Sequence, residues 1–495
     1  MTVSQSDPVL IGLDIGTSSV KGLMTAPGGA CLAAYSAPCQ TTHPAAGGAE
    51  QDPADWMRHV AAALARFAAH PRAAQVAAIG VTSQVNSHVF CDARGRPLRP
   101  AITWQDTRAA AQAARLDAAL TPEAKIAALG APIPIDASHA LSRMAWLAQV
   151  APEVWQNTAH VLLPKDYVIA GLTGEIASDP ISAVGLVGPD LAYAGAILDL
   201  WPGASAVLPR LADPLDIVGR VAAGHPFAGT PVALGTMDAW AGMFGLGVVT
   251  DGQGFYLSGT SDVLGLISSL GTGTAGIVTF PEWRGLRLHA GPTQSGGASL
   301  EWLSQVVGQQ VDALARLAGA AEVTAQGPLF LPHLQGERAP LWDSRSRGAF
   351  CGMTGATGPG DLVVAVMEGV AFSARMALEA VETSGAQTLQ RLRYGGGGAR
   401  SDAWSRIRAT ALGRSLDRVA SSDVGAVGAT VMAGAASGAM CNLSDATGAL
   451  VSLDRSFDPD PTEASRMEDR YAAFCELYRA LGNVNALIDP VRDDG

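Results

Sequence analysis

Short apolar runs alternate with longer, alanine-rich stretches along most of this chain. Short runs bounded by turn residues predict strands, whereas apolar positions that recur every third or fourth residue predict helices. The second pattern is clear over residues 55–69, where the apolar side chains fall on one helical face: Trp56, Val60, Leu64 and Phe67. Strands that alternate with helices in this way predict an α/β protein.

One polar turn occurs twice, about half the chain apart. Gly16-Thr17-Ser18 and Gly259-Thr260-Ser261 each follow one apolar run and precede another, which predicts strand, tight turn and strand in both places. Glycine lets the backbone approach a ligand closely, and the hydroxyl and N–H groups that follow can hold phosphate oxygens. The repetition predicts a phosphate group held by two related lobes.

The second half of the chain repeats the plan of the first, with no low-complexity linker between the halves. Further strands are expected at 76–82, 231–234 and 392–394, and further helices at 299–307, 359–384, 401–412 and 425–437. We therefore expect two packed domains, residues 1–246 and residues 247–495.

Composition and charge narrow the possible partners. A net charge of −12 over 495 residues argues against a nucleic-acid-binding surface. The longest apolar stretch contains Asp238, and a carboxylate at bilayer depth is costly, so we expect no membrane span. Six cysteines without a paired motif, no zinc-type cluster and no visible signal peptide predict a reduced, cytoplasmic protein.

The first polar turn carries flanking charges that suit nucleotide chemistry. Asp14 could orient a hydrated Mg²⁺ ion, while Thr17, Ser18 and Lys21 could meet nucleotide phosphates. An ordinary β-turn is the alternative interpretation. The chain contains no P-loop motif, which excludes that class of nucleotide-binding enzyme.

Two further segments suggest an acceptor site. Asp238 ends a predicted buried strand and could act as a general base for a substrate hydroxyl, or simply cap a helix or form an ion pair. Trp104, Asp106 and Arg108 combine an aromatic face with polar groups, which suits a polyhydroxylated ligand. A helix start capped by Asp106 is the alternative for that segment.

A run of four glycines, residues 395–398, follows a predicted strand and precedes a predicted helix. Bare backbone at such a place lets a flat ring or a phosphate lie against it. A purely structural turn explains the run equally well.

Taken in order, these motifs resemble those of the FGGY carbohydrate kinase family, in the actin-like, ribonuclease-H-like ATPase superfamily. The resemblance spans residues 11–437 and rests on six landmarks: Asp14 to Ser18, Trp104 to Arg108, Met237 to Ala239, Ser258 to Ser261, Gly336 to Pro340 and Gly396 to Ala399. The overall pattern is similar to that of xylulokinase-like members.

The resemblance implies two duplicated α/β domains of actin-like type around a deep cleft, with transfer of the γ-phosphoryl group of ATP to a sugar hydroxyl, assisted by Mg²⁺. It implies that Asp238 is the base and that Asp14 assists through the metal. The implied sugar-binding residues are Gln84, Val85, Asn86, Trp104, Asp106 and Arg108. The implied ATP-binding residues are Thr17, Ser18, Lys21, Gly259, Thr260, Gly297, Glu301, Gly397, Gly398, Ala399 and Asp402.

One loop departs from the family pattern. D-xylulose kinases usually have Gln-Met-His where this chain has Gln84-Val85-Asn86, and glycerol kinases have Gln-Arg-Glu. Asn86 donates and accepts hydrogen bonds without charge, which favours a neutral ketose or polyol, with a pentulose as the leading prediction. Open alternatives are another polyol, a sugar acid bound with the help of Arg108, and a non-catalytic, nucleotide-gated binding protein of the actin type. Self-association into a homodimer also stays open.

Overall fold

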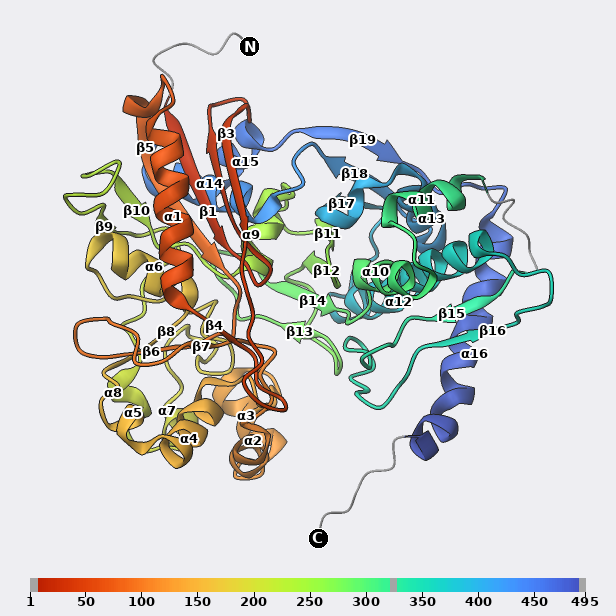
Figure 1. Ribbon diagram of the computed structural model, residues 1–495, viewed down its shortest axis with the longest axis horizontal. Coiled ribbons are helices and arrows are strands. Elements are labelled where there is room, and N and C mark those ends of the chain that lie inside the picture. The colour runs from red at the N-terminus through yellow and green to blue at the C-terminus, as the bar shows by residue number, and fades with distance from the viewer. Residues whose placement is uncertain (1–7, 321–326, 489–495) are drawn as a thin grey trace. The chain divides into compact units, whose positions relative to one another are not determined.

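The computed structural model describes residues 8–320 and 327–488 (Figure 1). The chain divides into two compact α/β units. Unit 1 comprises Met1–Val249, Pro281–Trp283 and Asp423–Ser452, and unit 2 comprises Thr250–Phe280, Arg284–Ser422 and Leu453–Gly495. No helix within the described ranges is long and apolar enough to cross a membrane.

A six-stranded sheet forms the centre of unit 1, in the order β3-β2-β1-β5-β10-β9. Its strands are β1 (Val9–Ile15), β2 (Ser19–Thr25), β3 (Cys31–Pro38), β5 (Val76–Ser83), β9 (Ile217–Arg220) and β10 (Pro231–Ala233). β1 is antiparallel to β2, as predicted for the first polar turn, and parallel to β5, which is parallel to β10. The carboxyl ends of β1, β5 and β10 therefore meet at one edge of the sheet, where the segments carrying Asp14, Gln84 and Asp238 emerge.

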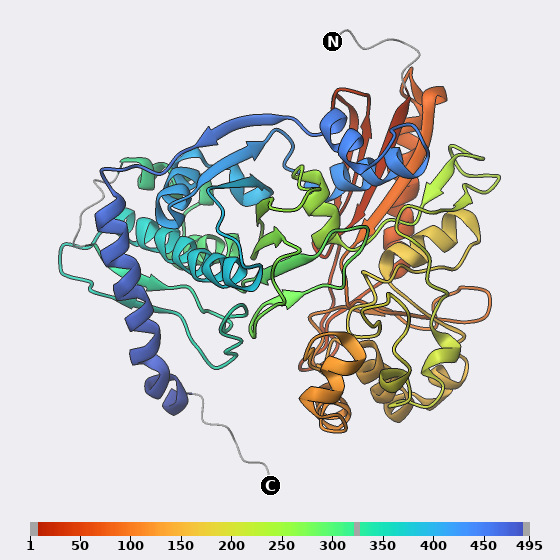
Figure 2. The same ribbon diagram turned by 180° about the vertical axis from the view of Figure 1, so that it is seen from behind.

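Helices cover the sheet of unit 1 on both faces. On one face α1 (Pro53–Ala68) packs against β2 and β3, beside α6 (Pro164–Thr173). On the other face α14 (Val424–Ala436) packs against β1 and β5 and against α9 (Asp238–Gly245) (Figure 2). The helix predicted at 55–69 is therefore present as α1, beginning two residues earlier, where Asp52 accepts a hydrogen bond from Ala54 N at 2.9 Å.

The position of α14 differs from the expected division, which assigned everything after residue 246 to the second domain. Glycines on the two central strands admit the helix. A Cβ on Gly12 would lie 2.0 Å from Ala426 O, and one on Gly80 would lie 2.0 Å from Ala429 O. α14 is built mainly of Val, Ala and Gly and is almost wholly buried, so it requires apolar cover all round. Segment 423–452 thus belongs to unit 1, although it follows most of unit 2 in sequence.

A smaller layer of helices and short strands completes unit 1 beyond the carboxyl edge of the sheet (Figure 1). Its helices are α2 (Ala110–Asp117), α3 (Pro122–Leu129), α4 (Ala140–Val150), α5 (Pro152–Gln156), α7 (Gly195–Leu198) and α8 (Ala204–Val207). Its strand pairs are β4 (Glu50–Gln51) with β7 (Ala101–Ile102), and β6 (Val89–Cys91) with β8 (His160–Leu162).

Unit 2 is built on a seven-stranded sheet in the order β13-β14-β12-β11-β17-β18-β19. Its strands are β11 (Gly254–Ser258), β12 (Asp262–Ile267), β13 (Val278–Thr279), β14 (Leu288–Pro292), β17 (Arg391–Gly395), β18 (Ser415–Val419) and β19 (Leu453–Phe457). β11 is antiparallel to β12 and parallel to β17. This repeats the relation of β1 to β2 and β5, so the predicted duplication of the plan is present at the centre of both sheets.

The helices of unit 2 are α10 (Gly297–Val307), α11 (Val311–Ala320), α12 (Pro359–Ser384), α13 (Asp402–Leu412) and the C-terminal α16 (Ala464–Ile488). Of these, α10, α12 and α13 correspond to the helices predicted at 299–307, 359–384 and 401–412, whereas the helix predicted at 425–437 is α14 of unit 1. The long α12 packs on β12 and β14 and against α13. A separate pair, β15 (Leu329–Leu331) and β16 (Ala349–Cys351), lies beside it.

Candidate functional site

Asp14 is a partly buried carboxylate near the carboxyl end of β1. Its Oδ1 is buried and has no hydrogen-bond partner among the residues that the structure describes. Burial, followed by the negative charges of Asp238 and Asp423, raises the pKa of Asp14 to about 7, and Lys21 only partly opposes them. The start of α14 lies close to the same carboxylate, because a Cβ added to Gly425 would lie 2.4 Å from Asp14 Oδ2. This carboxylate lacks a sufficient counter-charge.

Lys21 lies opposite Asp14 in the β1–β2 register. Its Nζ forms an ion pair of 3.0 Å with Asp423 Oδ1, and about a third of each side chain is exposed. Asp423 directly precedes α14, and the sequence gave no reason to single it out before the helix was placed on this sheet. The role of Lys21 toward a nucleotide therefore stays a prediction.

A hydrogen-bond network joins the first polar turn to the loop after β5. Thr17 Oγ1 donates to Gln84 Oε1 at 3.1 Å and accepts from Trp104 Nε1 at 2.9 Å. Gln51 Nε2 donates to Thr17 O at 2.7 Å, and Gln51 Oε1 accepts from Gln84 Nε2 at 2.9 Å. The structure thus joins Thr17 directly to Gln84 and Trp104, which the sequence predicted separately. Gln51, which the sequence did not indicate, bridges Thr17 and Gln84 as well.

Asn86 lies at the tip of that loop, with Val85 beside it, and both are partly exposed. Its φ of 53° is in the left-handed region, which asparagine tolerates better than most residues. Its Nδ2 donates to Ser138 Oγ at 3.3 Å. The loop tip is therefore held in one conformation with a neutral amide beside it.

Arg143, a residue that the sequence did not indicate, holds this loop through hydrogen bonds to Asn86 and His88. Its buried guanidinium donates to the carbonyl oxygens of Asn86 and Thr103, to Ile102 O at 3.1 Å and to His88 Nδ1 at 2.8 Å. Burial lowers the pKa of Arg143 to about 9. Burial, with Arg143 adding to it, also lowers the pKa of His88 well below its usual value, so His88 is a neutral acceptor. The only sequence signal for this role is that Arg143 stands among the apolar residues of α4.

Asp106 and Arg108 form an ion pair with each other. Arg108 Nη2 lies 2.6 Å from Asp106 Oδ2 and also pairs with Glu50, while the guanidinium lies 4.6 Å from the centre of the Trp146 ring. Asp106 also accepts from Ala49 N at 2.8 Å. The helix-cap interpretation of Asp106 is wrong, because α2 begins only at Ala110. Two carboxylates thus already compensate the charge of Arg108.

Asp238 is the first residue of α9 and is the fifth residue after the end of β10. It is half-buried, and its Oδ1 accepts from Ala239 N at 2.8 Å. Its charge is the second largest cause of the raised pKa of Asp14. The two carboxylates that the sequence singled out therefore act on one another at the same edge of the sheet.

In unit 2 the second polar turn is fixed by the start of α10. Gly297 N donates to Gly259 O at 2.9 Å, and Ala298 N donates to Thr260 O at 3.0 Å. A Cβ on Gly297 would lie 2.7 Å from Gly259 O, so the helix can approach this closely only without a side chain there. Thr260 and Glu301 are both exposed. The turn presents its hydroxyls at a helix N-terminus, an arrangement suited to anions.

The landmark at 336–340 supports this turn. Arg338 Nη2 donates to Thr293 O at 2.6 Å and to Ser261 Oγ at 3.2 Å. The buried Glu337 accepts from Ser295 Oγ at 2.5 Å. Through these hydrogen bonds the segment 336–340 fixes the second polar turn and the strand end beside it.

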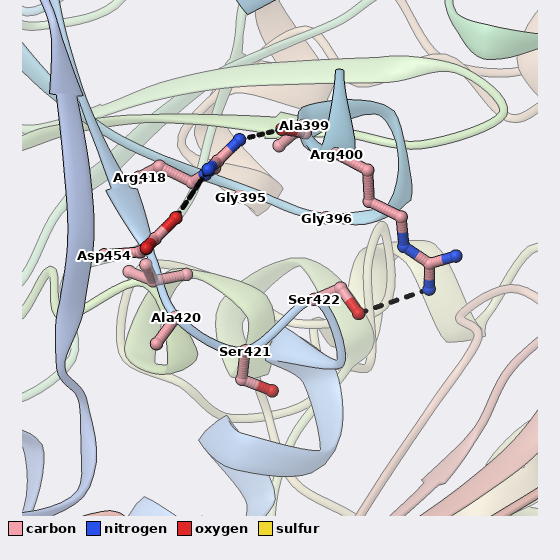
Figure 3. Close-up of a pocket in the computed structure, with 10 residues that line it drawn as sticks. Gly395, Gly396, Ala399, Arg400, Arg418, Ala420, Ser421, Ser422 and Asp454 are labelled. Atoms are coloured by element: carbon pink, nitrogen blue, oxygen red, sulfur yellow. Dashed lines mark hydrogen bonds and ion pairs between the residues drawn. The ribbon is translucent and has the colours of Figure 1, made fainter. Parts of the chain in front are cut away.

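The glycine run borders a cavity of about 270 Å³ (Figure 3). Its lining residues are Gly395, Gly396, Ala399, Arg400, Arg418, Val419, Ala420, Ser421, Ser422 and Asp454. Backbone and small side chains dominate this lining, together with two arginines. The cavity therefore combines exposed backbone with charged groups, namely the two arginines and Asp454.

Arg418 organises one wall of the cavity and was not predicted. Its Nη1 donates to Ala399 O at 3.0 Å, and its Nη2 pairs with Asp454 at 2.5 Å (Figure 3). The same Nη1 also donates to Asp402 Oδ1 at 2.7 Å. Asp402 itself does not line the cavity. Gly398 does not line it either, but a Cβ there would lie 2.2 Å from Ser258 Oγ, so the glycine run abuts the end of β11.

Comparison with known proteins agrees with these features. The family model for the N-terminal domain of the FGGY family of carbohydrate kinases matches residues 9–245, and that for the C-terminal domain matches residues 255–437. The xylulose kinase of Escherichia coli (strain K12) is 31% identical over 483 residues, which cover 95% of this chain and 99% of that protein.

Solved structures agree as well. The crystal structure of xylulose kinase from Rhodospirillum rubrum has a TM-score of 0.84 at 27% identity, covering 96% of this chain and 99% of that one. Ligand-bound xylulose kinase from Lactobacillus acidophilus, at 22% identity, has a TM-score of 0.86 over 97% of this chain and 100% of that one, and shows the fold alone. The predicted two-domain α/β fold of actin-like ATPase type is confirmed.

Proposed function

Because this chain belongs to the FGGY family of carbohydrate kinases, it is an ATP-dependent sugar kinase, and we propose that its acceptor is a neutral pentulose or a related ketose or polyol. Relatives named xylulose kinase that align over nearly the whole chain support this choice. Family membership argues against the alternative of a non-catalytic, actin-like binding protein. ATP as the donor and six free cysteines support a cytoplasmic location.

The observation that carries the proposal is the pair of carboxylates at one sheet edge, Asp14 and Asp238, of which Asp14 lacks a sufficient counter-charge. In the proposed reaction the acceptor oxygen forms a bond to the γ-phosphorus and the bond from that phosphorus to ADP breaks. The hydroxyl proton passes to the Asp238 carboxylate, which acts as general base. Holding the reacting groups in line supplies much of the rate.

Asp14 is suited to hold a water molecule of hydrated Mg²⁺. Its Oδ1 is buried without a partner among the described residues, and its raised pKa reflects a carboxylate that a cation would stabilise. Mg²⁺, when bound, would neutralise charge on the phosphoryl oxygens. Asp14 itself would orient that ion and contribute no proton transfer.

The acceptor would contact the loop tip at Val85 and Asn86 and the indole of Trp104. Because Asp106 and Glu50 already compensate Arg108, the guanidinium is poorly placed to recruit a sugar acid, which favours a neutral acceptor. Asp106 and Arg108 then act as supports for the acceptor site.

For the nucleotide we propose two sets of contacts. The polar turns would hold the phosphates through Thr17, Ser18 and Lys21 and through Gly259, Thr260 and Gly297, with Glu301 nearby. The glycine run, including Gly397, Gly398 and Ala399, would flank adenosine, with Arg418 forming one wall and Asp402 supporting Arg418 through its hydrogen bond. Small ligands generally occupy cavities of about this size that have a few fixed polar groups.

The proposal is tested by ADP release from ATP and Mg²⁺ on addition of ketopentoses, alditols and sugar acids. Asp238→Asn should lower kcat at least about 100-fold while nucleotide affinity changes little, because the amide cannot accept the proton. Asp199→Asn, a matched change of an exposed aspartate in unit 1, should leave kcat unchanged. A near-normal rate for Asp238→Asn would remove Asp238 from the base role, and a response to sugar acids alone would overturn the neutral acceptor.

A further inference from the structure

A buried cluster of three charges lies in unit 1, outside the contacts described so far. Lys165 Nζ lies 2.6 Å from Asp166 Oδ1 and 2.8 Å from Asp179 Oδ2, and none of the three side chains is exposed. Burial alone would lower the pKa of Lys165, but the two carboxylates raise it above its usual value. The cluster therefore joins one ammonium group to two carboxyl groups. Burying charges is costly, so a cluster of this kind is weak evidence for a role in stability alone.

The cluster is bonded to the segment that carries Asp238. Asp179 Oδ1 accepts from Thr236 Oγ1 at 2.8 Å, in addition to the backbone N–H groups of Ile181 and Ser182 at 3.1 and 3.0 Å. Thr236 is fully buried and stands two residues before Asp238. A hydroxyl that donates to a buried carboxylate makes a strong, directional bond.

Thr236 is also held through its backbone. Its carbonyl oxygen accepts from Thr82 Oγ1 at 2.6 Å, and Thr82 belongs to the neighbouring strand β5. The preceding residue, Gly235, has a φ of 64°, and a Cβ there would lie 1.9 Å from Val81 O. The chain between β10 and α9 thus turns sharply against β5 and is fixed on both sides of the Thr236 α-carbon.

The charged cluster is also bonded to strand β5 of the central sheet. Lys165 N, at the start of α6, donates to Ser83 Oγ at 3.1 Å, directly before Gln84. Lys165 and Asp179 therefore form a rigid anchor between the end of β5 and the end of β10. The same anchor borders both the loop of the proposed acceptor site and the segment of the proposed base.

We propose that Thr236 is a positioning residue for phosphoryl transfer, which sets the place of the Asp238 carboxylate through its bonds to Asp179 and Thr82. The inference rests on the proposed role of Asp238 as general base. Proton acceptance from a bound hydroxyl requires hydrogen-bond geometry, and a displacement of about 1 Å costs about 100-fold in rate. Loss of the Thr236 hydroxyl removes one of the two bonds that fix the segment and leaves a buried oxygen of Asp179 with one donor fewer.

The test compares Thr236→Val with Thr236→Ser. Valine keeps the shape and removes the hydroxyl, whereas serine keeps the hydroxyl and removes a methyl group. We expect kcat to fall about 10- to 100-fold in the valine variant, with the KM for ATP unchanged. The serine variant should stay within about threefold of wild type. A merely structural role would lower the yield of folded protein without separating kcat from the KM for ATP, so rates are normalised to the nucleotide-binding fraction.

A folded valine variant with normal kcat would overturn the inference, as would a serine variant as slow as the valine one. If the valine variant does not fold, Thr82→Val releases the same segment without touching the charged cluster, and a normal kcat there is equally decisive. Asp238→Asn is measured alongside. If it is inactive while Thr236→Val is normal, the positioning role alone fails. If Asp238→Asn is active, the base role fails and the positioning role falls with it.

Discussion

Replacing Asp14 by asparagine should stabilise the metal-free protein while abolishing phosphoryl transfer. The folded protein raises the pKa of Asp14 from 3.8 to about 7, mainly through burial and the charge of Asp238. Asparagine has nearly the same shape and carries no charge, so it removes the cost of holding the carboxylate there. The loss of activity follows from the proposed contact with hydrated Mg²⁺.

The magnitude follows from the pKa difference. A shift of about three units corresponds to about 4 kcal/mol for a fully buried group. Asp14 is only partly buried, so solvent screening reduces the expected gain to about 2 kcal/mol. For a domain of the size of unit 1, this amounts to a rise in Tm of about 3 °C.

The gain in stability expected for Asp14→Asn depends on pH. Below about pH 4 the carboxyl is protonated in both the folded and the unfolded protein, so the variant gains nothing. Between about pH 4 and pH 7 the unfolded chain loses its proton first, which progressively lowers the stability of the wild type. The stabilisation by Asp14→Asn should therefore grow through this window and reach its full value above about pH 7.

The assay is thermal and denaturant unfolding in the presence of a chelator, across that pH range, with Asp199→Asn as the control for a surface aspartate. Adding MgADP should then raise the Tm of the wild type more than that of Asp14→Asn. An Asp14→Asn protein that is less stable than the wild type at about pH 8, or a difference that does not vary with pH, would refute the reasoning.

Two glycine substitutions test the packing around the proposed sites. Gly425→Ala would place a Cβ 2.4 Å from Asp14 Oδ2 and should lower kcat about tenfold or more, whereas Gly448→Ala, which meets nothing within 4 Å, should not. Gly398→Ala would place a Cβ 2.2 Å from the hydroxyl of the serine that ends β11, and we expect the KM for ATP to rise about tenfold. Gly355→Ala, at a position of unit 2 outside the proposed sites where a Cβ meets nothing within 4 Å, is its control, and steady-state kinetics that do not separate the two pairs would contradict both expectations.

Local features of the site could be predicted from the sequence because each depends on a few consecutive residues. A glycine between two apolar runs predicts a tight hairpin wherever it occurs, and both polar turns are present as expected. Helix α12 coincides with its predicted range, because its apolar periodicity and its starting proline lie within the segment itself. The roles assigned to residues such as Lys21 and Asp402 stay predictions.

Residues that join distant segments of the chain were not predicted from the sequence. Arg143, for example, binds carbonyl groups of two segments that lie more than forty residues before it. Arg418 likewise draws together Ala399 and Asp454 across unit 2. The partners of these arginines are backbone and carboxylate oxygens that meet only in the packed fold, so the sequence does not show which segments each arginine joins.

By itself, the sequence determined the strands, the helices, the two phosphate-type turns and the family, since these follow from short-range patterns and from motifs in a fixed order. Only the tertiary structure decided which strand ends meet, that α14 packs on the first sheet, and that Thr236 is tied to a buried charged cluster. The physical reason is that helix α14 must bury all of its faces, and the glycines on β1 and β5 provide the space for it. That packing brings the start of the helix close to Asp14 and adds the charge of Asp423 to burial and Asp238, the larger causes of its raised pKa.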